Sequence, residues 1–105
     1  MTDLKKPAAD VLPKWLTVTA ESAVVQLTKA YTMNGIQVDK VTMRSPTLKE
    51  SRASQAEHPK DDNAAEMLLF TGLCEVPEKE LELLSVVDYM RLQRGYFRLV
   101  TEDEV

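Results

Sequence analysis

The sequence contains few of the residues that most catalytic and metal sites require. Its 105 residues include one histidine, His58, one cysteine, Cys74, and three widely separated glycines. A lone cysteine cannot form an internal disulfide, and separated glycines cannot build a phosphate-binding loop. The acidic run at residues 61–63 lacks the glycine of an EF-hand loop, and we interpret it as a helix cap. We therefore expect no catalytic residue, no metal site and no cofactor, and interpret the protein as non-enzymatic.

Long apolar runs and clustered positive charge are missing too. No apolar run approaches the roughly 18 residues that a membrane-spanning helix needs. The net charge is −4, and the part after Pro46 holds seven basic residues against thirteen acidic ones. A phosphate backbone is bound by clustered Lys and Arg, so neither nucleic acid nor a membrane is an expected partner. The first residues carry no secretory signal, and with a single cysteine we expect a cytoplasmic protein.

A β-hairpin is the clearest structural signal in the chain. Residues 24–33 are rich in β-formers with apolar side chains of one parity, as expected of a strand with one buried face. Asn34 and Gly35 follow, and this pair tolerates the positive φ angles of a type I′ turn. The hairpin is predicted over residues 24–44. A further short strand is predicted over residues 15–19.

The apolar pattern also predicts the register of this hairpin. The pairs expected next to the turn are Met33 with Ile36 and Tyr31 with Val38. Beyond these pairs the apolar positions of the second strand change parity. One extra residue near positions 39–40 would restore the phase and set Met43 opposite Leu27, so we predict a β-bulge there.

Two helix starts follow the hairpin. Thr47 and Glu50 have the spacing of a capping box, in which each side chain satisfies a free backbone N–H of the first turn. This box predicts a helix over residues 48–57. Asn63 is the predicted cap of a second helix, with Glu66 reaching back to it, and the helix ends at the lone cysteine. Apolar side chains lie on nearly all sides of this helix, so we expect it to be the most buried one.

Two more helices are predicted in the last third of the chain. Pro77 marks the start of a short one, and Ser85 with Asp88 resembles a capping box for a longer one reaching about residue 99. Gly95 lowers helix stability there, so we expect fraying or a bend after it. The stripe of this helix contains Val86, Met90 and Phe97. We interpret Met90 and Phe97 as core residues first and as a partner surface second.

These elements predict an α+β fold. A β-hairpin or small β-meander at the N-terminal side is followed by three to four short α-helices. We expect one domain over residues 15–100, with its helical part at residues 47–100, between a flexible arm at residues 1–14 and an acidic tail at residues 101–105.

The order of these motifs resembles that of a known family. The motifs are Asn34-Gly35, Val41-Thr42-Met43-Arg44, Ser45-Pro46-Thr47, Leu68-Leu69-Phe70-Thr71-Gly72-Leu73 and Leu84-Ser85 followed by Asp88-Tyr89 and Leu92. As an ordered set over residues 24–99, they resemble the small tail assembly chaperones of contractile-tailed, Mu-like bacteriophages and prophages. No catalytic residue is carried over from that family.

The resemblance implies a binding role in the cytoplasm of the bacterial host. A protein of this kind coats the long tape-measure protein during tail assembly, keeps it soluble, and is absent from the mature virion. The resemblance also implies a longer, frameshifted form of the chain and weak self-association into rings or spirals. From the residues themselves we hypothesise a docking surface of apolar side chains from the later helices. Its members are Leu69, Leu73, Met90 and Phe97.

A rival interpretation comes from a different class of protein. The chain would then be a structural component of the tail, such as a tube or connector subunit, that remains in the virion. The sequence does not separate these two interpretations, because a small acidic α+β domain suits both.

Overall fold

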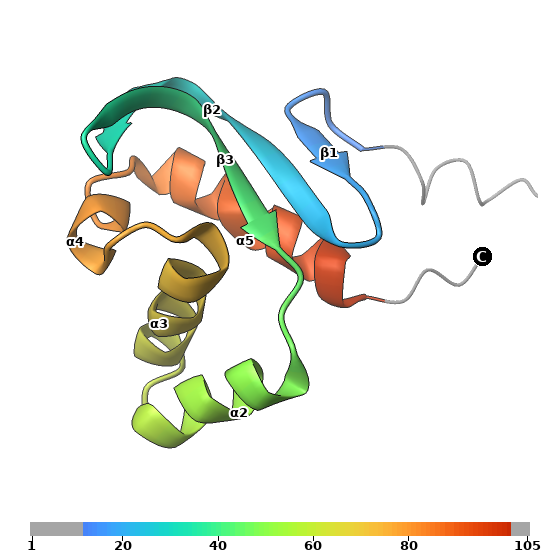
Figure 1. The fold of residues 1–105 in the computed structure, drawn as a ribbon, viewed down its shortest axis with the longest axis vertical. Helices are drawn as coiled ribbons and strands as arrows, with labels where there is room; N and C mark the ends of the chain where they lie inside the picture. The colour runs from blue at the N-terminus through green and yellow to red at the C-terminus, as the bar shows by residue number, and fades with distance from the viewer. Residues whose placement is uncertain (1–11, 102–105) are drawn as a thin grey trace, which may run out of the picture.

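The computed structural model, which describes residues 12–101, has the predicted α+β fold (Figure 1). The strands are β1 (Leu16–Val18), β2 (Ser22–Met33) and β3 (Ile36–Arg44), and the helices are α2 (Leu48–Glu57), α3 (Asp62–Cys74), α4 (Glu78–Leu81) and α5 (Val86–Val100). Within residues 12–101 the three strands precede the four helices, which confirms the predicted fold class. Most of the predicted arm and tail, residues 1–11 and 102–105, lies outside the described residues.

The sheet is antiparallel in the order β1-β2-β3, and its tight turn is the predicted one. Asn34 and Gly35 have φ angles of 54° and 80°, as a type I′ turn requires at both central positions. The two pairs predicted next to the turn are confirmed, with Met33 opposite Ile36 and Tyr31 opposite Val38.

The predicted bulge is on the wrong strand. Gln26 pairs with Lys40, so residues 27–30 of β2 stand against the single residue Asp39 of β3. The extra residues therefore belong to β2, and Met43 lies opposite Ala23 rather than Leu27. The physical reason lies outside the hairpin, because the backbone N–H of Thr28 donates to a side chain of α5 instead of to β3.

The capping box of α2 is present in full. The N–H of Glu50 donates to Oγ1 of Thr47 at 3.1 Å, and the N–H of Thr47 donates to Oε1 of Glu50 at 2.9 Å. Arg44, at the end of β3, also binds the Glu50 carboxylate. The Arg44 hydrogen bond, with that from the Thr47 backbone, lowers the pKa of Glu50 to about 2. The helix predicted over residues 48–57 is confirmed.

The cap predicted for α3 is wrong by two residues. Asp61, not Asn63, is the N-cap, because its side chain accepts from the N–H of Ala64 at 3.0 Å. Glu66 does not reach back to the cap, since its carboxylate binds two side chains of α5. α3 nevertheless holds five buried residues, as expected of a helix covered on several sides.

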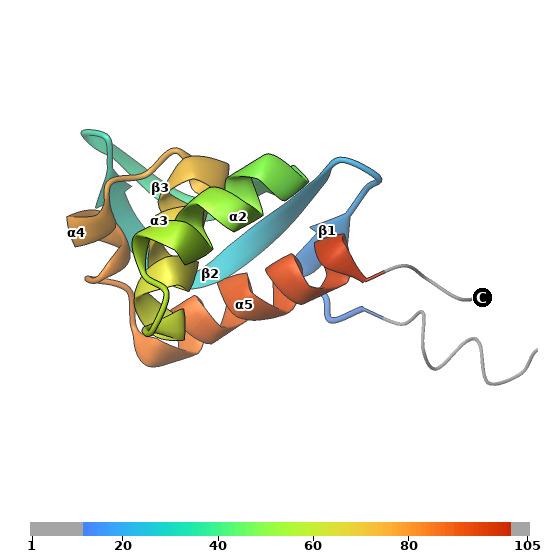
Figure 2. The same cartoon turned by 90° about the horizontal axis from the view of Figure 1, so that it is seen from below.

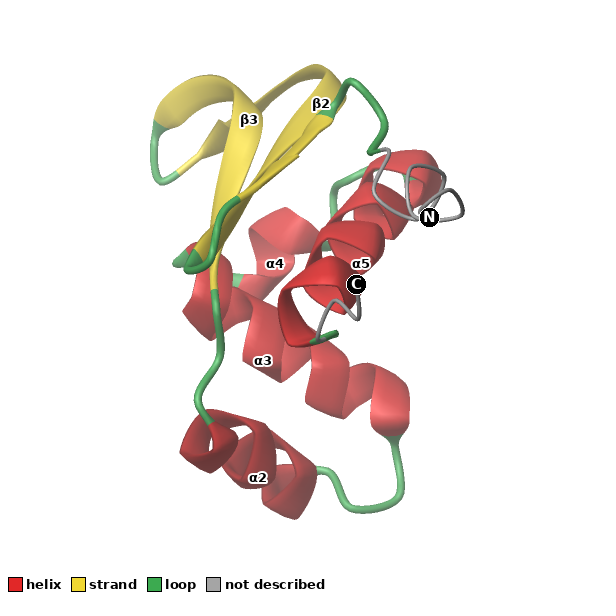
Figure 3. Ribbon diagram, turned by 90° about the vertical axis from the view of Figure 1, so that its right-hand side faces the viewer, coloured by secondary structure: helices red, strands yellow, loops and turns green. Residues whose placement is uncertain are grey.

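The helices form layers on one face of the sheet. α5 runs beneath β2 toward β1, α3 lies under β3, and α2 packs on the side of α3 away from the sheet (Figures 2 and 3). Phe70 is fully buried in this core, where its ring lies 5.6 Å from that of Tyr89 and 5.2 Å from that of Tyr96. Both distances suit aromatic packing.

α5 continues past Gly95 without the predicted fraying or bend. Gly95 is buried, and a Cβ atom there would lie 3.1 Å from Cγ2 of Val25 and 3.4 Å from Cδ1 of Leu16. The missing side chain lets the helix approach the sheet closely. Packing of α5 on β1 and β2 therefore outweighs the low helix propensity of glycine.

Candidate functional site

The position of α5 is fixed by a buried carboxylate. Asp88 has no exposed surface. Its Oδ1 accepts the N–H of Thr28 at 2.8 Å, and its Oδ2 accepts the hydroxyls of Thr28 at 2.8 Å and Tyr31 at 2.6 Å. The Tyr31 hydroxyl in turn accepts the N–H of Ser85 at 3.0 Å. One side chain thus joins the irregular part of β2 to the first turn of α5.

This network corrects the capping box predicted for α5. Ser85 caps the helix, since its Oγ accepts the N–H of Asp88 at 3.1 Å. The Asp88 carboxylate, however, turns to β2 instead of reaching back to Ser85. Burial by itself would raise the pKa of Asp88, but the hydrogen bonds from Tyr31 and Thr28 to the carboxylate outweigh it and leave the pKa below its usual value.

A second set of polar contacts joins α5 to α3. Oε2 of Glu66 accepts the hydroxyl of Tyr89 at 2.7 Å and Nε2 of Gln93 at 2.8 Å. Burial and the bond to Glu66 raise the pKa of Tyr89, so this hydroxyl stays a neutral donor. With one edge held by β2 and another by α3, α5 presents a fixed outer face.

That outer face is apolar. Val86, Met90, Phe97 and Val100 share one side of α5 and are 75%, 53%, 61% and 48% exposed. We call these four residues the α5 stripe. They lie opposite the buried Asp88, Leu92 and Gly95, so α5 carries one apolar face toward the core and another toward solvent. A surface helix usually exposes polar residues there, and exposed apolar side chains that gather on one face mark an interaction site.

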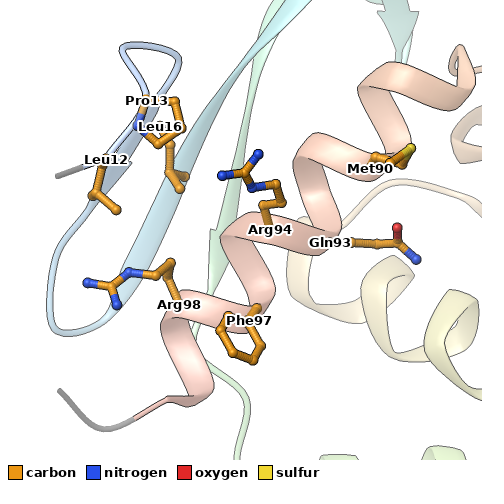
Figure 4. Close-up of a pocket in the computed structure, with 8 residues that line it drawn as sticks. All are labelled: Leu12, Pro13, Leu16, Met90, Gln93, Arg94, Phe97 and Arg98. Atoms are coloured by element: carbon orange, nitrogen blue, oxygen red, sulfur yellow. The ribbon is translucent and has the colours of Figure 1, made fainter. Parts of the chain in front are cut away.

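A hollow of about 480 Å³ lies beside this stripe, between β1 and α5 (Figure 4). Its lining comes from both elements and from the residues before β1: Leu12, Pro13, Leu16, Met90, Gln93, Arg94, Phe97 and Arg98. We call it the β1–α5 hollow. Two of its members, Met90 and Phe97, also belong to the α5 stripe, so stripe and hollow form one continuous surface.

Trp15 and two arginines border this surface. The guanidinium of Arg91 lies 4.8 Å from the centre of the Trp15 ring, and that of Arg94 lies 5.6 Å from it. Arg91 also donates to the carbonyl of Gln26 at 2.7 Å. These contacts hold the chain before β1 against α5 and place positive charge along this edge of the helix.

The structure divides the predicted docking residues into two groups. Met90 and Phe97 are exposed on the α5 stripe, so the interpretation that placed them first in the core is wrong. Leu69 and Leu73 are 8% and 2% exposed, so the folded chain does not present them at its surface. The reason is that α3 packs against β3 and α2 and also contacts α5 through Glu66 and Phe70, which leaves little of it facing solvent.

The residues considered for catalysis, His58 and Cys74, have structural roles. His58 ends α2, where its N–H donates to the carbonyl of Ser54. Cys74 is buried, and burial raises its pKa to about 12, which disfavours the reactive thiolate. Between residues 12 and 101, no group of three or more His, Cys, Asp or Glu side chains is placed to hold a metal ion. The helices of this part are also too short or too polar to cross a bilayer.

Sequence reasoning missed the group that positions the surface. The sequence predicts only a cap at Asp88, because nothing in the local pattern links it to Thr28 and Tyr31, which lie 60 and 57 residues away.

The positive edge of α5, in contrast, has a signal in the sequence. Arg91, Arg94 and Arg98 recur at three- and four-residue spacing. That spacing predicts one positive edge of a helix.

Comparison with known proteins identifies a matching family. The model of a family described as "Phage tail assembly chaperone proteins, E, or 41 or 14" matches residues 24–101. No curated protein and no solved structure matches the chain. The matched span is well over half of the chain and contains the complete α5 stripe.

Proposed function

Because the chain belongs to the family of phage tail assembly chaperone proteins, we propose that it binds the tape-measure protein and keeps it soluble during tail assembly. The binding surface in this proposal is the α5 stripe with the adjoining β1–α5 hollow. The role is one of binding without catalysis.

The observation that carries the proposal is the outward apolar face of α5. Its four side chains are about half exposed or more, although the helix is held firmly by the Asp88 and Glu66 contacts. Leaving such side chains in water is unfavourable unless a partner covers them. A helical apolar segment is a natural partner, because helices dock by packing an apolar stripe against a groove.

Further parts of the proposal follow from the motif resemblance described above. We propose that the phage is contractile-tailed and Mu-like, and that the chain acts in the host cytoplasm and is absent from the mature virion. We also propose that it works together with a frameshifted longer form of itself and self-associates weakly. None of these parts depends on the geometry of α5.

Co-expression with the tape-measure protein tests the binding surface. The soluble fraction of the tape-measure protein should rise when the wild-type chain is present, and Phe97→Asp with Met90→Asp should abolish this rise. Leu48→Asp is the matched control, because Leu48 is 68% exposed on α2, outside the proposed surface. If the two stripe substitutions leave the solubility unchanged, or the control abolishes it equally, the proposed surface is wrong.

Mass spectrometry of purified particles separates the proposal from its rival. A chaperone that leaves during assembly should be missing from mature virions, whereas a tube or connector subunit should be abundant in them. Stoichiometric recovery of this chain from mature particles would overturn the chaperone role and favour the structural one.

A further inference from the structure

The positive charge beside the α5 stripe indicates which kind of helix would bind there. This inference rests on the proposed function. Arg94 and Arg98 line the β1–α5 hollow, and Arg91 lies on the same edge of α5 (Figure 4). Arginine side chains reach the mouth of the hollow, while Leu12, Pro13 and Leu16 line its opposite side. The surface therefore combines an apolar floor with one positive edge.

α5 offers no acidic group of its own to this edge. Its only acid is Asp88, which is fully buried and already accepts bonds from Thr28 and Tyr31. Arg94 and Arg98 line the hollow without an acid from this helix beside them. A carboxylate is the group that binds a guanidinium most strongly.

The same charges argue against a second copy of this chain on the stripe. Two α5 helices packed face to face and antiparallel would bring the arginine edge of one copy near that of the other, with no acid on α5 to separate them. Like charges in this position disfavour the contact. An occupant with acidic residues faces no such repulsion.

We infer that the α5 stripe and the β1–α5 hollow receive an amphipathic helix that carries acidic residues along one flank. Its apolar side packs on Met90 and Phe97, and its carboxylates bind Arg94 and Arg98. The bidentate geometry of arginine with a carboxylate then fixes the direction in which the partner helix lies. In the proposed function this helix is a segment of the tape-measure protein.

Two synthetic peptides test the inference with the full-length chain. Both are helices of about 20 residues with the same apolar stripe, one flanked by Glu and the other by Lys at the same positions. Trp15, the only tryptophan, lies beside the hollow and reports binding by its fluorescence. The Glu peptide should bind at least about tenfold more tightly at low salt. Equal affinities would overturn the inference.

Charge reversal locates the effect. Arg94→Glu with Arg98→Glu should invert the preference so that the Lys peptide binds more tightly. Lys49→Glu with Arg52→Glu on α2 changes the net charge equally, away from the surface, and should leave the preference unchanged. Arg98→Glu alone, which spares the Arg94 contact with Trp15, should reduce the preference, with circular dichroism melts showing that each variant is folded. If the folded double variant Arg94→Glu with Arg98→Glu still prefers the Glu peptide, the inference is overturned.

The outcomes also separate this inference from the proposed function. If the Phe97 and Met90 variants abolish solubilisation of the tape-measure protein while the Arg94 and Arg98 variants do not, the function stands and the acidic partner is wrong. If neither pair affects solubilisation, the proposed surface itself fails. Self-association that Phe97→Asp abolishes would identify a second copy as the occupant and overturn the inference.

Discussion

Asp88 is the residue on which the arrangement of the molecule depends most. It satisfies an N–H in the irregular part of β2 and two hydroxyls, all within 2.8 Å. Buried donors that lack an acceptor are costly, so β2 can depart from regular pairing only where such an acceptor is available. The irregular strand and the buried carboxylate therefore depend on each other.

Replacing Asp88 by alanine should lower the free energy of unfolding by about 3 kcal/mol at pH 7, because three donors lose their acceptor. The folded-state pKa of Asp88 is lowered, so its contribution is present above the unfolded-state pKa of about 3.9 and is lost as the pH falls through the folded-state value. Urea denaturation at several pH values should show the difference from wild type shrinking below about pH 4.

The control for this prediction is Asp39→Ala, which removes an exposed carboxylate from β3. Its effect should stay below about 0.5 kcal/mol at pH 7. Glu50 also titrates at low pH, but it is present in every variant, so its contribution cancels from the comparison. A difference between wild type and Asp88→Ala that stays constant from pH 7 to pH 3 would contradict the lowered pKa.

At the scale of elements, features with local causes were predictable and those with distant causes were not. The turn at Asn34 and Gly35 and the box of Thr47 with Glu50 each need only neighbouring residues, and both occur as expected. The bulge and the close approach at Gly95 depend on contacts between elements far apart in the chain. The periodic pattern of one strand or helix does not predict such long-range contacts.

Gly95 tests how closely α5 must approach the sheet. Gly95→Leu should lower the free energy of unfolding by about 2 kcal/mol, since even its Cβ would crowd Val25 and Leu16. Gly72→Leu is the matched control, because Gly72 is exposed in α3 and has nothing within 4 Å of a Cβ. It should raise stability by roughly 0.5 kcal/mol through helix propensity alone. Thermal melts that rank the two variants in the opposite order would contradict the packing argument.

At the scale of the whole molecule, the difficulty in predicting the docking surface came from α5 having two apolar faces. The sequence places apolar residues on both sides of the helix, and only the fold decides that Leu92 is buried while Met90 and Phe97 are exposed. The fold likewise turns Leu69 and Leu73 inward. A partner that binds the outer face need not disturb the core beneath it.

The thiol of Cys74 can detect whether partner binding opens the core. Cys74 is buried next to Leu73, and its raised pKa of about 12 makes the thiol unreactive while the core is closed. A thiol reagent at pH 8 should label it slowly in the folded chain, at a rate limited by transient opening, and quickly in urea. Adding the tape-measure partner should leave the rate unchanged or reduce it, because binding at the α5 stripe requires no opening. Faster labelling in the complex would mean that α3 moves to expose Leu69 and Leu73, and that the binding surface is the inner one.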